Sequence, residues 1–313
     1  MMDGLTRDPF REDVIKGLGQ RQKAIPSRWL YDEKGSKLFD EITELPEYYP
    51  TRTELKILGD RAGEMADAIG PEAVIVEYGA GSLLKVRILL DALERPAAFV
   101  PVDISASHLE AAADELTADY PDLTIKPIAS DFMASNLGES LPEAAGRRAG
   151  FFPGSTVGNL LDAEIHRFLS NARADLGDGA CFIIGIDQPK PPRILVPAYD
   201  DAQGVTAAFN KNLLTRMNRE LDANFDLDAF AHEARWNESD SRIEMHLCSL
   251  KPQTVRVAGE SFDFQDGETI HTENSRKIAL DRFAGMAEKA GWSLSRHWTD
   301  EKGLFAVMLL EAD

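Results

Sequence analysis

Acidic residues and glycines follow three consecutive apolar runs in the first half of the chain. The first run leads into Glu77-Tyr78-Gly79-Ala80-Gly81, the second ends near Asp103, and the third precedes Asp131-Phe132. Glycines allow a tight turn and a close approach of the backbone to a ligand. A carboxylate after the second strand can accept both hydroxyls of a ribose. This spacing predicts an adenosine-binding pocket, with Asp131 at the adenine amino group and Phe132 beside the ring.

The charge of the first turn distinguishes between two kinds of adenosine cofactor. A dinucleotide fingerprint reads G-x-G-x-x-G, but Leu84 stands at its third glycine position. A dinucleotide also places its pyrophosphate at a helix N-terminus, where the acidic Glu77 contributes nothing. S-adenosylmethionine carries an ammonium and a sulfonium and no phosphate, so this pocket suits it better. The pattern favours an S-adenosylmethionine-dependent methyltransferase over a nicotinamide dehydrogenase, and an ordinary βα turn without a ligand is the alternative to both.

Alternating strands and helices are expected to position these residues. The expected strands are Val74–Tyr78, Ala98–Ile104, Thr124–Ile128, Gly150–Gly154 and Ala180–Ile186. The expected helices are Ser82–Leu93, a helix capped by Ser105 that runs through Leu116, and Asp162–Leu176. This alternation predicts a doubly wound parallel α/β sheet from about residue 70 to 188, with helices on both faces. Strands at Trp292–Trp298 and Leu304–Leu310 predict the antiparallel hairpin that completes the Rossmann-like sheet of a class I methyltransferase.

The N-terminal region is expected to be mainly helical. Ser36 can cap a short helix, and Thr51 can cap a helix that ends at Ile69, with Glu54 in the capping-box position. The region after the core begins with a stiff, proline-rich connection at residues 189–197. It continues with a long helix at Tyr199–Leu221, a strand region at Arg242–Val257 and a helix at Ser275–Ala290.

These elements predict two domains. We assign residues 60–195 and 280–313 to the methyltransferase core. Residues 1–59 and 196–279 then form an α+β substrate-binding domain. This second domain is expected over the carboxyl ends of the strands, where open α/β sheets bind their ligands.

Composition argues against several classes of protein. The chain has 313 residues, 43% of them hydrophobic, which is enough for a large core. Its formal net charge of −19 disfavours nucleic acid and anionic membranes as partners. Cys181 and Cys248 lie in apolar runs and are expected to be buried and reduced. We see neither a signal peptide nor an apolar stretch of roughly 20 residues, so we expect a cytoplasmic monomer that acts on a small molecule.

Longer motifs outside the glycine turn carry a family resemblance. They are Tyr31–Ser36, Leu45–Glu54, Phe152–Leu160, Ala198–Asp201 and Thr272–Lys277. These segments resemble the histidine-specific methyltransferases of ergothioneine biosynthesis, and the resemblance runs from about Ile25 to the end of the sequence. It implies Nα-trimethylation of L-histidine to hercynine, with S-adenosylmethionine as methyl donor and no metal.

The resemblance also implies a set of site residues. It implies cofactor contacts at Tyr48, Gly79, Gly81, Lys85, Asp103, Asp131 and Phe132. It implies histidine contacts at Tyr31, Gly154, Thr156, Asn159, Tyr199, Met245, Glu273 and Ser275. Asn159 and Tyr199 would hold the amino-acid end, and Tyr31 and Asn159 are the catalytic candidates. The run from Tyr78 to Leu84 departs from the family, which more often has smaller or more polar residues there.

The chemistry of the residues agrees with methyl transfer to an amine. A neutral amine displaces the methyl group of a sulfonium, and the neighbouring cation lowers the pKa of that amine. Proximity supplies much of the catalysis, so little covalent machinery is required. The serines do not stand in G-x-S-x-G, and the six histidines form no H-E-x-x-H or comparable metal pattern. Arg242, Glu244 and His246 alternate with an apolar face and are expected to be solvated or to bridge neighbours.

Recognition of an imidazole requires polar groups at both ring nitrogens. Glu273 and Ser275 are two residues apart, so an extended segment would place both side chains on one face. The alternative for Ser275 is an N-cap of the following helix. Two other functions stay open at this point: methylation of another α-amine, such as that of tryptophan or a modified histidine, and cofactor binding without catalysis.

Overall fold

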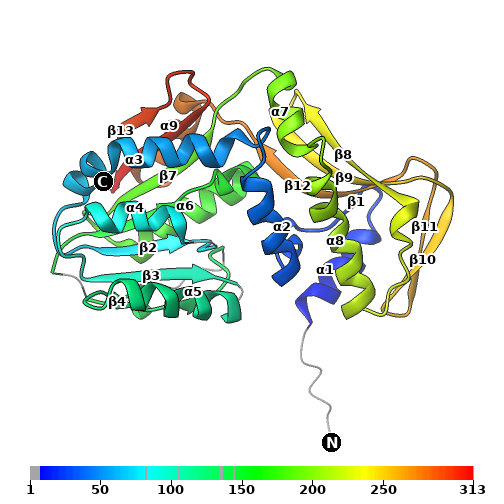
Figure 1. Ribbon diagram of the computed structural model, residues 1–313, viewed down its shortest axis with the longest axis horizontal. Coiled ribbons are helices and arrows are strands. Elements are labelled where there is room, and N and C mark those ends of the chain that lie inside the picture. Colours follow the sequence, from blue (N-terminus) through cyan, green and yellow to red (C-terminus); the bar gives the residue numbers. More distant parts are fainter. Residues whose placement is uncertain (1–7, 82, 105, 134–136, 144, 313) are drawn as a thin grey trace, which may run out of the picture. The chain divides into compact units, whose positions relative to one another are not determined.

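The computed structural model describes residues 8–81, 83–104, 106–133, 137–143 and 145–312, apart from the side chains of residues 107 and 108. The chain divides into two compact units (Figure 1). Unit 1 consists of Met1–Tyr48 and Pro191–Ser275, and unit 2 consists of Tyr49–Lys190 and Arg276–Asp313. The divisions therefore lie at residues 48/49, 190/191 and 275/276, whereas the sequence led us to place them at 59/60, 195/196 and 279/280.

Unit 2 is built on one mixed sheet with the order β13-β14-β7-β6-β2-β3-β4, and β5 also pairs with β3. Its strands are β2 (Val74–Tyr78), β3 (Ala98–Asp103), β4 (Thr124–Ile125), β5 (Ile128–Ala129), β6 (Arg148–Phe152), β7 (Cys181–Asp187), β13 (Trp292–Thr299) and β14 (Phe305–Ala312). Strands β2 to β7 pair in parallel, and β14 pairs antiparallel with both β7 and β13. The structure thus confirms a doubly wound α/β sheet that ends in an antiparallel hairpin.

Helices cover both faces of this sheet because its strands are apolar on both sides. The helices are α3 (Tyr49–Ile69), α4 (Leu84–Ala92), α5 (Ala106–Asp119), α6 (Asp162–Leu176) and α9 (Leu280–Glu288). Val74 and Val76 of β2 join a core with Phe168 of α6 and Phe283 of α9. Ile75, which lies between the two valines, joins a second core with residues of α3, α4 and α5. This alternation follows from the two-residue period of a strand.

Unit 1 combines helices with two small sheets. Its helices are α1 (Pro9–Leu18), α2 (Glu33–Thr43), α7 (Pro192–Tyr199) and α8 (Val205–Glu220). A four-stranded sheet has the order β1-β12-β9-β8, and β10 pairs with β11. These strands are β1 (Lys23–Ala24), β8 (Phe230–Asn237), β9 (Arg242–Ser249), β10 (Gln253–Val257), β11 (Glu260–Phe264) and β12 (Thr269–Arg276).

The first helices begin at other residues than the sequence suggested. The carboxylate of Asp32 accepts the backbone N–H of Gly35 and caps α2, so Ser36 lies inside that helix. Helix α3 begins at Tyr49, so Thr51 is not its cap. Because α3 is one continuous helix that packs Ile57 and other residues into the core of unit 2, the division of the chain precedes it.

Helix α7 forms where a stiff proline-rich connection was expected, and the long helix expected at Tyr199–Leu221 begins only at Val205 as α8. Pro192 starts α7, since a proline at the first helical position gives up no hydrogen bond that the helix needs. The side chain of Asp201 accepts the N–H groups of Val205 and Thr206 at the start of α8. Gly204 has φ +74°, which breaks the helical path between α7 and α8.

Further boundaries also differ from expectation. The expected strand 242–257 is divided into β9 and β10, and the expected strand 124–128 into β4 and β5. The expected helix 275–290 begins only at Leu280, and Ser275 belongs to strand β12. The expected cap Ser105 lies outside the described residues, and so does Ser82.

Two expectations from composition can be compared with the structure. Cys181 and Cys248 are free and buried, and burial raises the pKa of the Cys181 thiol to about 11. Within the described ranges, every helix is too short or too polar to cross a membrane.

We predict that Gly150→Ala destabilises unit 2. A Cβ atom at Gly150 of β6 would lie 2.3 Å from Cδ2 of Phe182. Overpacking of this kind costs about 1–3 kcal/mol. Gly63→Ala is the control, because Gly63 lies within α3 with nothing within 4 Å of its would-be Cβ. This substitution should raise the free energy of unfolding by about 0.5–1 kcal/mol, since alanine favours a helix over glycine. Urea unfolding measures both, and equal effects of the two substitutions would contradict this packing.

Candidate active site

The glycine turn lies where β2 ends. Gly79 has φ +71°, a conformation that a residue with a Cβ adopts only at a cost. The N–H groups of Gly79 and Ala80 donate to the carbonyl of Val102 on β3 at 2.8 and 3.0 Å. These bonds fix the turn at the carboxyl edge of the parallel sheet. Gly81 follows the turn and is exposed.

Two carboxylates lie at the same edge of the sheet. Asp103 is the last residue of β3, and Asp131 follows β5, which pairs with β3. The carboxylate of Asp131 accepts the N–H of Met133 at 2.8 Å. A Cβ at Gly79 would lie 3.6 Å from the ring of Phe132, so this ring borders the turn. The structure therefore brings together the cofactor residues expected in unit 2.

Lys85 takes part in a buried ion pair that we did not expect. Lys85 belongs to the first turn of α4, and its ammonium lies 2.7 Å from the carboxylate of Glu54. Glu54 is only 1% exposed. Both oxygens of Glu54 also accept the N–H of Gly154, at 2.9 and 2.8 Å. Gly185 of β7 lies so close that a Cβ there would be 2.0 Å from Glu54 Oε1. Glu54 is thus a partner of Lys85 and Gly154 and not part of a capping box.

Glu77 is a buried carboxyl beside the glycine turn. Burial raises its pKa to about 8, and the negative charges of Glu54 and Asp103 act in the same direction against the opposing effect of Lys85. Its Oε2 atom has no hydrogen-bond partner among the residues that the structure describes. An orphaned, buried oxygen next to a positive-φ glycine suits a ligand that brings a cation, such as the ammonium of S-adenosylmethionine. The residues of this turn therefore fit that group.

The loop after β6 holds three residues expected at the substrate. Gly154 has φ +83°, and its would-be Cβ lies 3.3 Å from Nζ of Lys85. The hydroxyl of Thr156 donates to the carbonyl of Pro153 at 3.0 Å. Asn159 is half-buried at the end of the short helix Thr156–Asn159. The loop is anchored because Oγ of Ser155 accepts the N–H of Asp187 at 2.9 Å.

The remaining expected residues gather in unit 1. Glu273 and Ser275 are both buried on β12. The hydroxyl of Tyr31 donates to Oε1 of Glu273 at 3.4 Å, and that of Tyr199 lies 2.6 Å from Oγ of Ser275. The ring of Tyr48 contacts that of Tyr199, with centroids 5.9 Å apart. Since Ser275 is part of a strand, it does not cap the following helix.

The surroundings of Tyr31 keep its hydroxyl protonated. Burial raises the pKa of Tyr31 well above its ordinary value, and the negative charge of Glu273 raises it further. The ring is held by edge contacts with Phe39 and Phe209. Met245, the last expected residue, is buried on β9, and its carbonyl accepts the hydroxyl of Thr272 on β12. The expected residues thus form two groups, one in each unit, and Tyr48 belongs to the group in unit 1.

The sheet of unit 2 defines the class of the protein. The chain is similar in structure to the CcbJ methyltransferase from Streptomyces caelestis, with a TM-score of 0.50 and 16% sequence identity over 82% of this chain and 95% of that one. A likeness at this level supports the fold, which is that of the class I methyltransferases.

Sequence comparison then gives the family. The profile of the SAM-dependent, histidine-specific methyltransferases matches residues 10–312, and the chain belongs to this family. It is 44% identical to the histidine N-alpha-methyltransferase of Mycolicibacterium smegmatis, over 96% of this chain and 94% of that one. Its identity to the enzyme of the same name from Mycobacterium tuberculosis is 43%, with the same coverage. These findings confirm the resemblance, the methyltransferase class and the methyl donor.

We predict that Glu77 makes stability depend on pH. Below about pH 4.5, its ordinary pKa, the carboxyl is protonated in both states; between there and about pH 8 it ionises only in the unfolded chain. The free energy of unfolding of the cofactor-free protein should therefore fall across this window, by about 1.4 kcal/mol per unit of pKa shift. Glu77→Gln should flatten the decline. Urea unfolding at a series of pH values measures this, and parallel curves for the two proteins would refute it.

Proposed function

We propose that this protein catalyses the Nα-trimethylation of L-histidine to hercynine, the first step of ergothioneine biosynthesis. The observation that carries the proposal is the pair of buried polar residues on β12, Glu273 and Ser275, each next to a tyrosine hydroxyl. Membership in a histidine-specific family supports the same substrate. The acidic surface, with a net charge of −19, supports a small amino acid over a polyanion.

In this proposal Glu273 and Ser275 recognise the imidazole. A neutral imidazole presents one N–H donor and one acceptor nitrogen. The carboxylate of Glu273 can accept the donor, and the hydroxyl of Ser275 can donate to the acceptor. Tyr31 donates to the Glu273 carboxylate and keeps it oriented. A site built of such groups discriminates strongly against side chains that leave them unpaired.

The amino-acid end of the substrate is assigned to other residues. We assign it to Asn159 and Tyr199, with Gly154 and Thr156 as further contacts and Met245 beside the imidazole. Asn159 offers both a donor and an acceptor, which suits a group with an amine and a carboxylate. We assign Tyr31 and Asn159 the catalytic role of holding the amine in line for attack, since orientation supplies much of the rate. The amine loses its proton to solvent before attack, because the neighbouring sulfonium lowers its pKa.

The cofactor residues follow from the edge of the parallel sheet. We propose that Asp103 accepts the ribose hydroxyls, Asp131 the adenine amino group, and that Phe132 packs on the ring. Gly79 and Gly81 allow the backbone to approach the cofactor. Tyr48 and Lys85 are the remaining residues that we assign to cofactor binding. When bound, S-adenosylmethionine supplies an electrophilic methyl group on a sulfonium. Glu77 can ionise against its ammonium, since a neighbouring cation lowers the pKa of a carboxyl.

The test of the proposal is a competition among substrates. A mixture of the twenty amino acids is incubated with the protein and S-adenosylmethionine, and the products are analysed by mass spectrometry. We expect histidine carrying one, two and then three methyl groups on its α-nitrogen. Methylation of tryptophan or another amine in its place would sink the assignment, and so would binding of S-adenosylhomocysteine without turnover of any amino acid.

We predict that Glu273→Gln raises the KM for histidine. Loss of a charged hydrogen-bond partner costs about 1.5–3 kcal/mol, or roughly 10- to 100-fold. Affinity for S-adenosylhomocysteine, measured by calorimetry, should stay within about twofold. The matched control is Glu260→Gln, which changes an exposed residue on β11 of the same unit. An unchanged KM in a Glu273→Gln protein of normal circular dichroism would show that Glu273 does not bind the imidazole.

A further inference from the structure

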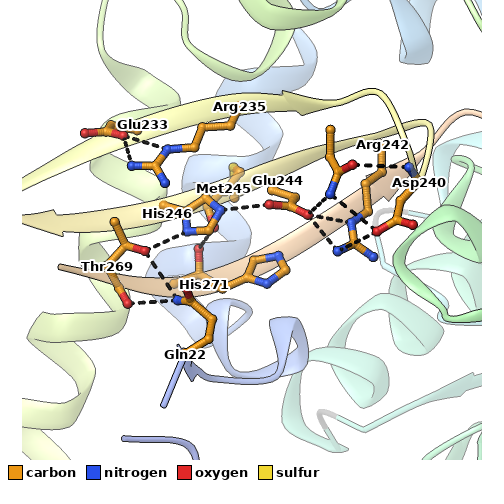
Figure 2. A network of polar contacts seen from close by, with 12 residues as sticks. Gln22, Glu233, Arg235, Asp240, Arg242, Glu244, Met245, His246, Thr269 and His271 are labelled. Carbon is orange, nitrogen blue, oxygen red and sulfur yellow. Dashed lines mark hydrogen bonds and ion pairs between the residues drawn. The ribbon is translucent and has the colours of Figure 1, made fainter. Parts of the chain in front are cut away.

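Two histidines and a glutamate meet on the four-stranded sheet of unit 1. Glu244 and His246 lie on β9, and His271 lies on the neighbouring strand β12 (Figure 2). The two imidazole rings are stacked, with centroids 4.8 Å apart and planes inclined by 17°. Oε2 of Glu244 lies 3.1 Å from Nε2 of His246. One nitrogen or oxygen atom from each of the three residues lies within 4.8 Å of the other two.

The burial of this cluster differs from what the sequence suggested. We expected Glu244 and His246 to be solvated or bridging. Both bridge neighbours, but His246 is not solvated, since it is only 4% exposed. Glu244 keeps 14% of its side chain exposed. Glu244 is thus the more exposed member of its pair with His246.

The carboxylate of Glu244 is oriented from its other oxygen. Oε1 accepts Nε of Arg242 at 2.7 Å and Nδ2 of Asn237 at 2.9 Å. Oε2 is left facing His246. A carboxylate held at one oxygen, with the other directed at a neighbouring histidine, resembles a monodentate metal ligand with its supporting contacts.

Each histidine is also oriented by a partner outside the cluster. Nδ1 of His246 lies 3.1 Å from Oγ1 of Thr269, and Nε2 of His271 lies 3.0 Å from the carbonyl oxygen of Glu273. An imidazole that donates one N–H to an oxygen keeps its second nitrogen unprotonated, as a metal ligand requires. Both histidines thus have the supporting contacts found around bound metals.

We propose that Glu244, His246 and His271 bind a divalent transition-metal ion, with zinc as the preferred ion. Two imidazoles and one carboxylate, with a place open to water, are a zinc ligand set. Ligand bonds of about 2.0–2.2 Å place two ligands of one ion about 3–4 Å apart. The separation of 3.1 Å between Glu244 and His246 already meets this condition. The ligand atoms of the three residues lie within 4.8 Å of one another, so a rotation of the His271 side chain out of its stack with His246 is needed to bring the third ligand within range.

The guanidinium of Arg242 limits the strength of this site. It lies 2.6 Å from the carboxylate of Glu244 and competes with a cation for the same charge. With three protein ligands and this competitor, zinc binds more weakly than in a closed four-ligand structural site. The proposed mechanism of methyl transfer uses no metal, so zinc at this cluster is not required for the reaction.

Calorimetric titration with zinc tests the site. Untagged protein, free of chelators and of histidine, is titrated with zinc chloride, and we expect binding of one ion per chain. His246→Ala and His271→Ala should each weaken binding by at least about 100-fold, since even contacts behind a ligand are worth 10- to 100-fold. The matched control is His297→Ala, an exposed histidine on β13, which should bind zinc as the unaltered protein does. No binding by the unaltered protein, or equal binding by all four proteins, overturns the proposal.

Two further measurements separate loss of the site from loss of the fold. Glu244→Gln keeps the shape of the side chain and one acceptor oxygen for Arg242 and Asn237, so it should fold normally and still lose zinc affinity. Zinc should raise the thermal midpoint of the unaltered protein and leave that of Glu244→Gln unchanged, because an ion stabilises only the state that binds it. An equal rise of the thermal midpoint in both proteins would show that zinc binds at another site, and it would contradict the assignment.

Discussion

One buried carboxylate, Asp187 at the end of β7, ties together the framework of unit 2. Its oxygens bind the hydroxyl of Tyr49 at 2.6 Å, the ammonium of Lys277 at 2.8 Å and the ammonium of Lys190. Its backbone N–H anchors Ser155, and with it the loop that carries Gly154 and Asn159. Tyr49, Lys190 and Lys277 each lie within two residues of a point where the chain passes between the units. A single side chain therefore fixes the loop at β6 and all three of these chain segments.

Two buried ammonium groups around one carboxylate are not an arrangement chosen for stability. Lys277 is completely buried, and burial lowers the pKa of Lys190 to about 8 despite the charge of Asp187. Apolar replacements of such groups are often as stable or more so. The cluster instead fixes the arrangement of these side chains, since each buried charge has low energy only beside its partner. The buried pair of Lys85 and Glu54 also fixes an arrangement, because Glu54 binds the N–H of Gly154 at the edge of the sheet where the glycine turn lies.

The sequence was informative where a signal is local and failed where partners are distant in the chain. Strand β2 and helix α6 have the predicted bounds, because an apolar run and a helical period depend on neighbours alone. The pattern Thr51-x-x-Glu54 equally fits a capping box, and only the fold shows Glu54 bonded to Gly154, 100 residues away. The motifs led to Glu273, Ser275, Tyr31 and Tyr199, but only the fold shows which tyrosine pairs with which strand residue. Nothing local distinguished Asp187 from any other acidic strand end.

The place of β14 in the sheet has a consequence for the synthesis of the protein. Strand β14 pairs with β7, yet residues 191–275, the second segment of unit 1, are made between them. While a ribosome translates that segment, β7 presents an unpaired edge, and every residue of this strand before Asp187 is apolar and buried in the folded protein. Exposed edges of this kind invite pairing with other chains. The nascent protein therefore exposes this edge for a period that is set by the speed of translation.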